Sequence, residues 1–360
     1  MMDALAREVW ERRGGRGKFI WAMAVPLSLL YGLAVRLRNL FFRFGWLASV
    51  RLPRPVVSIG NLTVGGTGKT PACLWLAREL QNRGRRVAIL SRGYRRQEKK
   101  ALVLRPQELG LAVVEDEVVL RSGDEPLMMA RLYGYNVGVC KNRRDAADEL
   151  LRAVEIDVFI LDDGFQYRRL KRDVDLLLLG SDSSGWLLPA GPFREPRKNL
   201  ERSDLILVTG AQSVWKEFIP QSRAAGSYSA SLEAVSLVGF DSQCLKEYPL
   251  SWLHRRKILT VSGIADPSGL YRLIHEHNGE IVNTLEFPDH HSYTTLDWQK
   301  INRMGRPADL IVTTEKDILK LQRFPFSKEK LVALRVATVV ENGAALVDAI
   351  VNRMESAGRA

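Results

Sequence analysis

"IGNLTVGGTGKTP", residues Ile59 to Pro71, is the segment that decides the fold of this 360-residue chain. It contains Gly68, Lys69 and Thr70, the Gly-Lys-Ser/Thr triplet of phosphate-binding loops. Thr63 stands where the usual pattern begins with glycine, but the glycines that follow still let backbone amides turn toward phosphate oxygens. An apolar run precedes the segment and a helical pattern follows it. This context favours a P-loop over a glycine-rich turn with a chance lysine.

The loop residues have different roles in holding a nucleoside triphosphate. Lys69 is predicted to reach the β and γ phosphates, and Thr70 to hold Mg²⁺. The amino terminus of the next helix would face the anion, and Pro71 suits its first turn because no N–H is needed there. We therefore expect ATP and Mg²⁺ as ligands, with the nucleotide bound by Thr63, Val64, Gly65, Gly66, Thr67, Gly68, Lys69 and Thr70.

Apolar runs of strand length alternate with helical stretches after the loop. "DVFILDD", "VDLLLLG" and "DLILVTG" are apolar on both faces, which is typical of parallel strands covered by helices. The pattern restarts near residue 212 with "KILTVSGI" and "ADLIVTT". We predict an α/β fold, P-loop NTPase-like, with a doubly wound, mostly parallel sheet and a second, smaller α/β lobe. The expected domains are an N-terminal helical module (1–54), a nucleotide-binding lobe (55–212) and a C-terminal lobe closing over the site (213–360).

A P-loop needs an acidic side chain for its metal ion, and "VFILDDGFQ" offers two. Asp162 and Asp163 end an apolar strand, where the carboxyl end of a parallel strand delivers a carboxylate to the nucleotide crevice. The alternative is a plain strand-to-turn sequence. The P-loop upstream favours metal ligation by this pair.

The net charge of +12 is concentrated near the N-terminus. Residues 12–54 contain nine basic side chains and no acidic one, and they bracket the apolar stretch Phe19–Val35. Apolar residues then recur at helical spacing opposite arginines, as in a helix at a lipid interface. A signal peptide and a buried core helix are the alternatives. We expect an N-terminal membrane-associated helix that binds an anionic membrane surface, and no nucleic acid partner.

The three cysteines are widely spaced and lie in apolar or mixed surroundings. Cys73, Cys140 and Cys244 form no metal-binding or disulfide pattern. This usage is typical of buried thiols in a reducing cytosol.

Six further strings follow one another along the chain: "SRGYRR" (91–96), "GDEP" (123–126), "LDDGFQYRRLKRD" (161–173), "PAGPFREP" (189–196), "FPDHHSY" (287–293) and "TTEKD" (313–317). In this order they resemble one family, tetraacyldisaccharide 4′-kinase of lipid A biosynthesis. The resemblance implies a membrane-seated P-loop kinase that moves the γ-phosphate of ATP to the 4′ hydroxyl of a tetraacyldisaccharide 1-phosphate, forming lipid IVA. It also implies an acylated glucosamine disaccharide 1-phosphate as partner and the cytoplasmic face of the bacterial inner membrane as location.

The same resemblance implies the catalytic residues. Asp124 of "GDEP" would be the base that accepts the proton of the acceptor hydroxyl, assisted by His290, with His291 as the alternative. Glu195 of "PFREP" would be an acid near the metal. Without the family resemblance, the sequence favours Asp124 as a helix N-cap and His290 as a structural histidine.

A different class of function also fits the loop. "GGTGKT" resembles the membrane-switching ATPases, in which an additional lysine precedes the glycines. Val64 stands at that position. The alternative function is therefore a membrane-recruited P-loop ATPase switch with no small-molecule acceptor, but it lacks its signature residue and leaves Asp124 and His290 unexplained.

Overall fold

The computed structural model describes residues 2–109, 116–181, 185–210, 212–215, 217–241, 244–327 and 329–358. The chain divides into two compact units, and each is assembled from segments far apart in the sequence. The first unit comprises Met1–Val87, Glu155–Ser231 and Thr338–Ala360, and the second comprises Ala88–Val154 and Leu232–Ala337.

This division differs from the sequential lobes expected from the sequence. Residues 88–154 were expected in the nucleotide-binding lobe but belong to the second unit. The closing helix α12 (Gly343–Gly358) was expected in the C-terminal lobe but belongs to the first unit. Both units alternate strands and helices, so no change in this pattern marks the points where the chain passes from one unit to the other.

The first unit contains the parallel sheet that the apolar runs predict. Strand β1 (Val56–Asn61) pairs in parallel with β5 (Val158–Leu161) on one side and β6 (Val174–Leu179) on the other. Strand β6 pairs with β7 (Leu205–Val208), which pairs with the start of β8 (Ser227–Asp241). Every residue of β1, β5, β6 and β7 is buried. The predicted α/β class with a mostly parallel sheet is confirmed.

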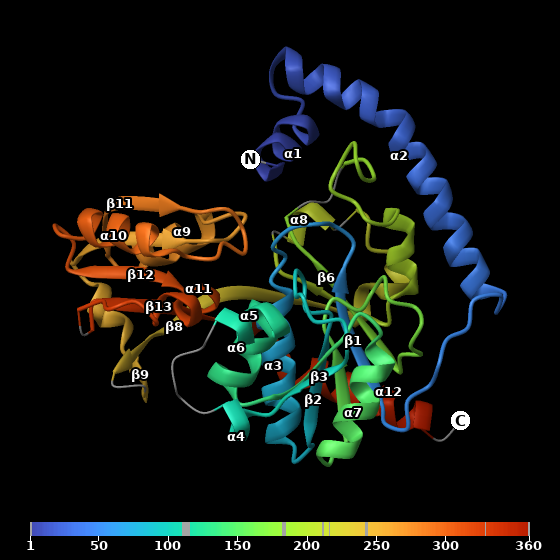
Figure 1. Ribbon diagram of the computed structural model, residues 1–360. Helices are drawn as coiled ribbons and strands as arrows, with labels where there is room; N and C mark the ends of the chain where they lie inside the picture. The colour runs from blue at the N-terminus through green and yellow to red at the C-terminus, as the bar shows by residue number, and fades with distance from the viewer. Residues whose placement is uncertain are drawn as a thin grey trace. The chain divides into compact units, whose positions relative to one another are not determined.

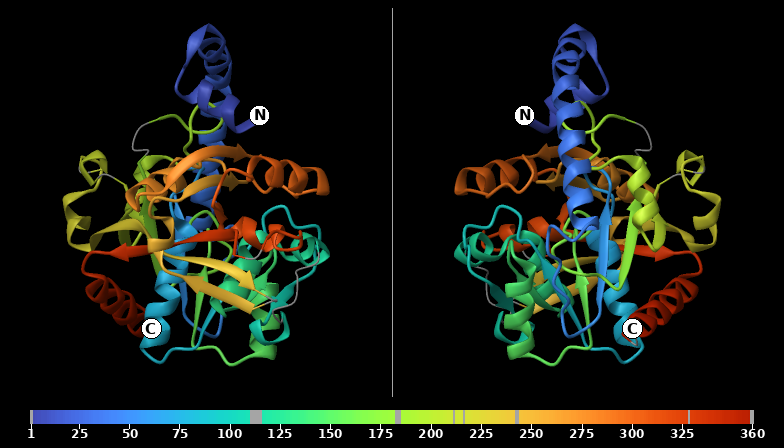
Figure 2. Two further views of the ribbon diagram at one scale, coloured as in Figure 1. Left: turned by 90° about the vertical axis from the view of Figure 1, so that its left-hand side faces the viewer. Right: turned by 90° about the vertical axis from the view of Figure 1, so that its right-hand side faces the viewer.

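Two helices from opposite ends of the chain pack together in this unit. Helix α3 (Lys69–Asn82) follows the P-loop and contacts β1, and α12 contacts α3, β1 and β6. The two helices lie side by side in Figures 1 and 2. A Cβ atom on Gly343 would lie 3.1 Å from the ring of buried Trp75, so a glycine suits this close approach at the start of α12. The shorter elements of the unit are η1 (Arg197–Arg202), α8 (Gln212–Trp215) and η2 (Gln221–Gly226).

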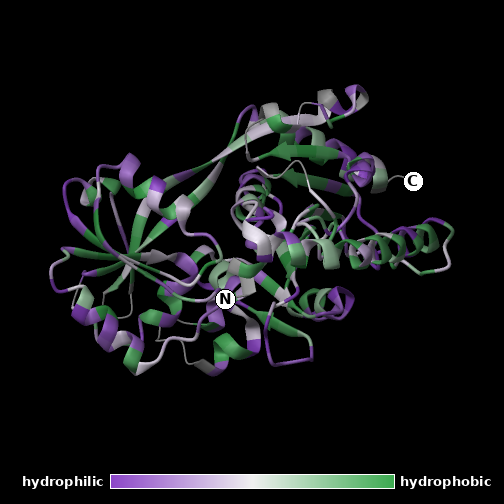
Figure 3. Ribbon diagram, turned by 90° about the horizontal axis from the view of Figure 1, so that it is seen from above, coloured by the Kyte–Doolittle hydropathy of each residue, from purple (hydrophilic) through white to green (hydrophobic). Residues whose placement is uncertain are grey.

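The N-terminal segment forms α1 (Met2–Trp10) and the 30-residue helix α2 (Gly14–Arg43). A single helix thus covers both the apolar stretch and the start of the amphipathic stretch that follows it. Its buried residues are mostly small: Gly17, Ala24, Ser28, Gly32 and Val35. Its exposed face carries the large apolar side chains, including Phe19, Met23, Leu30, Leu33 and Leu37. Much of the helix is accordingly hydrophobic in Figure 3.

The second unit contains a second parallel sheet. Strand β10 (Lys257–Ser262) pairs in parallel with β11 (Glu280–Glu286) and β12 (Leu310–Thr314), and β12 pairs in parallel with β13 (Leu331–Val340). Strand β9 (Cys244–Tyr248) runs antiparallel to β8. Its helices are η3 (Leu250–Leu253), α9 (Ser268–Glu276), α10 (Thr295–Met304) and α11 (Glu315–Leu321).

Residues 88–154 add a further strand group to this unit. Strand β2 (Val87–Ser91) pairs in parallel with β4 (Asn136–Val139), which pairs antiparallel with β3 (Leu102–Leu104). Helix α6 packs against α11, which comes nearly 200 residues later, and so brings two distant parts of the chain together. The helices of this segment are α4 (Pro106–Leu109), α5 (Asp116–Ser122), α6 (Asp124–Tyr133) and α7 (Arg143–Ala153).

Candidate active site

The P-loop links β1 to α3 in the first unit, at the carboxyl end of β1. Gly65 and Gly68 have φ angles of +107° and +77°, in the left-handed region that favours glycine. Side chains hold the turn between them: the Asn61 amide donates to Oγ1 of Thr67 at 2.9 Å. The Thr209 hydroxyl donates to the backbone oxygen of Thr67 at 3.0 Å. The loop is thus built in its turned form by contacts within the unit.

Three charged side chains gather beside this loop. Lys69, the first residue of α3, has its Nζ 3.8 Å from Oδ1 of Asp163. Arg194 Nη1 donates to both oxygens of Asp163, at 3.0 and 2.8 Å. Asp163 has a φ of +48°, so its backbone adopts a conformation uncommon for a non-glycine residue. A pair of cations beside a P-loop can neutralise phosphate oxygens, and Asp163 holds both of them in place.

The oxygen donors at this end of the sheet suit a hard divalent cation. Thr70 lies in the first turn of α3, and Asp162 follows directly after β5 with only 5% of its surface exposed. A hydroxyl and a carboxylate are ligands that Mg²⁺ accepts, and Mg²⁺ usually takes only one or two carboxylates plus phosphates and waters. Among the described residues, no group of three or more His, Cys, Asp or Glu side chains could hold a metal ion.

Glu195 lies in a different environment from the other predicted metal ligands. Its carboxylate is fully buried and accepts from Arg38 Nη2 at 2.8 Å and Arg202 Nη2 at 2.9 Å. Asn39 and Asn199 donate to its second oxygen at 3.3 and 2.6 Å. Four side-chain donors thus contact the two carboxylate oxygens. These contacts favour a structural role for Glu195 over a role as a Mg²⁺ ligand.

The segment that bears Arg194 and Glu195 is also the platform for α2. Ser28 donates to the backbone oxygen of Leu187 at 2.8 Å, and Tyr31 donates to that of Arg194 at 2.9 Å. A Cβ atom on Gly32 would come within 2.8 Å of the Leu187 side chain, so the helix approaches this segment closely at Gly32. The apolar helix is thereby joined to the wall of the P-loop.

The second unit brings Asp124 and His290 together. Asp124 is the first residue of α6, and His290 lies in the loop between β11 and α10. Nδ1 of His290 is 3.2 Å from Oδ2 of Asp124, and because a carboxylate only accepts, the Nδ1–H donates. His290 has a φ of +60°, and Tyr94 packs against its ring at 5.2 Å. Strained backbone of this kind is common at functional sites.

Asp124 is not the helix cap that its position in the sequence allows. The N-cap of α6 is Gly123, with a φ of +87°, and no side chain caps the helix. Burial raises the pKa of Asp124, but the hydrogen bond from His290 and the positive charge of Lys320 outweigh it, and the net pKa is far below its usual value. The helix amino terminus also favours the anion. Asp124 is therefore held as an ionised carboxylate.

The two neighbouring histidines have different partners. His291 Nε2 contacts Oδ2 of Asp297 at 3.0 Å, and its ring stacks on Phe287. Asp297 also forms the capping box of α10 with Thr294. His291 is thus part of the packing at the start of α10, while His290 faces Asp124.

Lys320 is the residue beside the dyad that the sequence did not reveal. Its Nζ is 3.0 Å from Oδ2 of Asp124 and 3.1 Å from Oδ1 of Asp317. Asp317 belongs to the string "TTEKD", which carried the family resemblance without a role. The only local signal is the i, i+3 spacing of Asp317 and Lys320, which places them on one face of α11.

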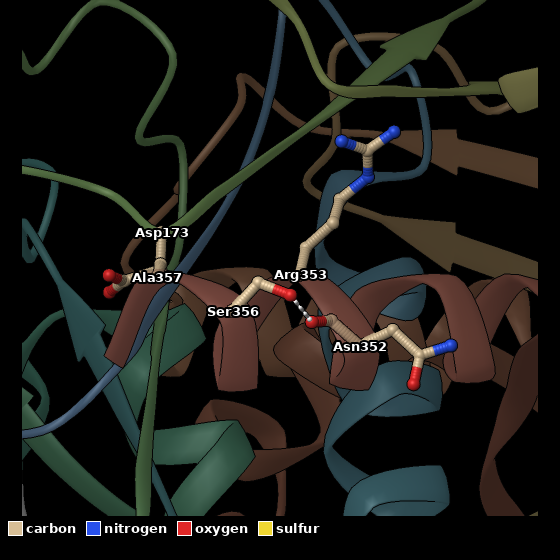
Figure 4. Close-up of a pocket in the computed structure, with 5 residues that line it drawn as sticks. All are labelled: Asp173, Asn352, Arg353, Ser356 and Ala357. Carbon is tan, nitrogen blue, oxygen red and sulfur yellow. Dashed lines mark hydrogen bonds between the residues drawn. The ribbon is translucent and has the colours of Figure 1, made fainter. Parts of the chain in front are cut away.

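An open hollow of about 400 Å³ lies beside α12 in the first unit (Figure 4). Its lining residues are Asp173, Asn352, Arg353, Ser356 and Ala357. Asp173 precedes β6 and accepts from the backbone N–H of Val56 at 2.8 Å. The hollow is therefore at the amino ends of the strands, opposite the P-loop, and it is not the nucleotide site.

Comparisons with known proteins find similarity to one family over most of the chain. Residues 20–355 match the family described as tetraacyldisaccharide-1-P 4′-kinase. A tetraacyldisaccharide 4′-kinase from Pelobacter propionicus is 37% identical over 363 residues, covering 96% of this chain and 95% of that protein. A tetraacyldisaccharide 4′-kinase from Geobacter metallireducens is 38% identical over 315 residues, covering 84% and 89%.

A solved structure matches the fold over nearly the whole chain. The crystal structure of LpxK from Aquifex aeolicus in complex with ATP aligns with a TM-score of 0.77 and 32% sequence identity. The alignment covers 93% of this chain and 99% of that one. The similarity therefore includes parts of both units.

Proposed function

The chain belongs to the tetraacyldisaccharide-1-P 4′-kinase family, and we propose that it transfers the γ-phosphate of ATP to the 4′ hydroxyl of an acylated glucosamine disaccharide 1-phosphate, forming lipid IVA. The observation that carries this proposal is the contact between Asp124 and His290. A P-loop alone is compatible with ATP hydrolysis. A buried, ionised carboxylate paired with a histidine is what removal of a proton from an acceptor hydroxyl requires.

Asp124 is the proposed general base. As the acceptor oxygen attacks the γ-phosphorus, its O–H bond breaks and the proton passes to the Asp124 carboxylate while ADP leaves. His290 donates to Oδ2 and so orients the carboxylate. The second contact of His290, Nε2 to Oδ2 of Asp289 at 3.5 Å, fixes the ring from its other side.

The first unit supplies the charge needed to hold the triphosphate. Lys69 and Arg194 lie beside Asp163 and can bind phosphate oxygens, and the α3 amino terminus favours the anion. Thr70 and Asp162 would hold Mg²⁺, which when bound neutralises charge on the phosphate oxygens. The loop residues from Thr63 to Thr70 would wrap the phosphates.

We also propose that α2 seats the protein on an anionic membrane surface, at the cytoplasmic face of the bacterial inner membrane. The helix is long and apolar enough to cross a bilayer by length and composition, and only 22% of its most apolar window is buried within the protein. Its large apolar side chains are exposed to solvent, whereas its buried residues are mostly small. An exposed face of large apolar side chains favours a helix that lies in the membrane–water interface and holds the enzyme beside a lipid substrate.

The decisive experiment measures transfer of labelled γ-phosphate to a disaccharide lipid acceptor in mixed micelles. The kinase proposal expects a labelled lipid product and ATP turnover that depends on the acceptor. The alternative, an ATPase switch, expects turnover that is unchanged when the acceptor is omitted. Turnover without any labelled lipid would reject the proposal.

A further inference from the structure

Lys320 occupies a buried position beside the proposed base. Only 4% of its side chain is exposed, although an ammonium group is costly to bury without partners. Its three nearest acceptors are Oδ2 of Asp124 at 3.0 Å, Oδ1 of Asp317 at 3.1 Å and the backbone oxygen of His291 at 3.0 Å. The contacts with Asp124 and His291 are hydrogen bonds, and the contact with Asp317 is an ion pair, so the buried ammonium group has partners in three directions.

The contact of Lys320 falls on the same oxygen of Asp124 that His290 contacts. Two donors on Oδ2 fix the rotation of the carboxylate about its Cβ–Cγ bond. Oδ1 is then the oxygen that can accept a proton from a substrate hydroxyl. His290 and Lys320 come from different elements, so the carboxylate is held from two directions.

We propose that Lys320 is a positioning residue for the base: its ammonium group anchors Oδ2 of Asp124, keeps the carboxylate ionised and leaves Oδ1 for the acceptor hydroxyl. This inference rests on the proposed function, because it assigns Lys320 a role in that transfer. Lys320 does not touch the substrate in this role. It acts through Asp124.

Asp317 explains how Lys320 can stay charged through the reaction. When Oδ1 of Asp124 takes the proton, the carboxylate becomes neutral and one ion pair of Lys320 is lost. Asp317 remains paired with the ammonium group, and its other oxygen accepts from the Gly263 N–H at 2.8 Å and the Thr314 hydroxyl at 2.7 Å. The buried cation therefore keeps a counter-ion in both protonation states of the base.

The charged and titratable groups around Asp124 within the second unit set the pH dependence. His290 and Lys320 contact it directly. The groups one step further away are Asp289 and Lys316, which pair with each other at 2.8 Å, together with Asp317, Tyr293 and Glu125. Lys320 contributes the positive charge nearest to Oδ2 apart from any charge on His290.

The test compares the pH profile of kcat/KM in the unchanged protein and in Lys320→Met. Loss of a cation within 4 Å raises the pKa of a carboxylate by about one to three units. The acidic limb of the profile is expected to move to higher pH by that amount, and the rate lost to protonation of Asp124 should return as the pH rises to neutral. A uniform loss at all pH values, with the limb in place, would overturn the inference.

Two further variants separate positioning from folding. Lys320→Met alone removes the cation that pairs with Asp317. Lys320→Met/Asp317→Asn also removes the negative charge of Asp317, so only Asp124 keeps its charge. This double variant should show the same displacement of the acidic limb. Arg335→Met is the matched control, since it breaks another buried pair of this unit, between Arg335 Nε and Oε1 of Glu315 at 3.0 Å. It should lower the melting temperature without moving the limb. An equal displacement in Arg335→Met would also overturn the inference.

A titration without substrate distinguishes this inference from the proposed function. The carboxyl carbon resonance of Asp124, assigned by its loss in Asp124→Asn, is followed against pH in the unchanged protein and in Lys320→Met. A midpoint about one to three units higher in the variant supports the anchoring contact even if no lipid is phosphorylated. An unchanged midpoint overturns it even if transfer is observed.

Discussion

His290 Nδ1 lies 3.2 Å from Oδ2 of Asp124, although 166 residues separate the two along the chain. The pair predicts a specific pattern of kinetic losses. Asp124→Asn keeps the shape and removes the base, so turnover should fall by a factor on the order of 10² to 10⁴ with nearly constant nucleotide affinity. His290→Ala should lose less, and the double variant should be little worse than Asp124→Asn, since groups that act as a unit are not additive. Independent, multiplying losses would contradict the dyad.

Lys69→Ala should reduce transfer by about a hundredfold or more, because the P-loop loses its own cation, which lies beside Asp163 and can balance phosphate charge. Labelled γ-phosphate transfer and the melting temperature are measured together. Arg78→Ala is the control on the same helix, since Arg78 is exposed and pairs with its neighbour Glu79. More than about a tenth of the activity in Lys69→Ala would argue against phosphate binding by this lysine.

Asp162→Asn and Asp163→Asn should differ in their dependence on Mg²⁺. Asp162→Asn removes an anionic oxygen ligand, so it should need a higher Mg²⁺ concentration for half-maximal rate. Asp163→Asn leaves Arg194 and Lys69 without their counter-ion and should mainly weaken ATP binding. Magnesium titrations at saturating ATP decide between them. If only Asp163→Asn shifts the titration, the direct ligand is Asp163.

Glu195→Gln should destabilise the protein without changing the Mg²⁺ titration. The substitution removes the fully buried carboxylate that pairs with Arg38 and Arg202, and loss of one partner of a buried ion pair costs about 3–5 kcal/mol. Denaturant unfolding measures the stability, and the titration is repeated on the folded variant. A shifted Mg²⁺ requirement at unchanged stability would restore Glu195 to the ligand set.

Leu30→Glu/Leu33→Glu should release the protein from anionic vesicles. Both side chains are exposed on α2, and burying a leucine in an apolar environment contributes about 1.5–3 kcal/mol. Co-sedimentation with vesicles should therefore fall roughly tenfold or more, since 1.4 kcal/mol is a factor of ten. Leu296→Glu is the control, because Leu296 is 75% exposed in the second unit. Equal release by the control would argue against α2 as the membrane contact.

Much of the first unit could be predicted because its signals are local. The P-loop, the apolar strand before it and the acidic pair after β5 are each contained in a few consecutive residues, and parallel strands place their carboxyl ends at one edge. Asp124 and His290 carry no such local signal. They were named through the family resemblance, and only the packing of distant segments brings them into contact.

The roles of buried charges could not be predicted. The sequence shows Glu195 beside Arg194 but not the donors Arg38 and Arg202 that enclose it. Nothing in the sequence distinguishes Lys320 from other lysines in short helices. Its role depends on the packing of α11 against α6. The division into units was hidden for the same reason, since it depends on which distant segments pack together.

The return of the last helix to the first unit sets an order of events during synthesis. Residues 338–360 belong to the same unit as the P-loop, yet they leave the ribosome after the whole second unit. Domains usually fold from the N-terminal end as the chain emerges, at about 5–20 residues per second. Here α3 is synthesised long before α12. The apolar surface around Trp75 therefore lacks its contact with α12 while nearly the whole second unit is translated. The nascent chain therefore presents an open nucleotide-binding unit, together with the apolar helix α2, to the chaperones and membranes it meets.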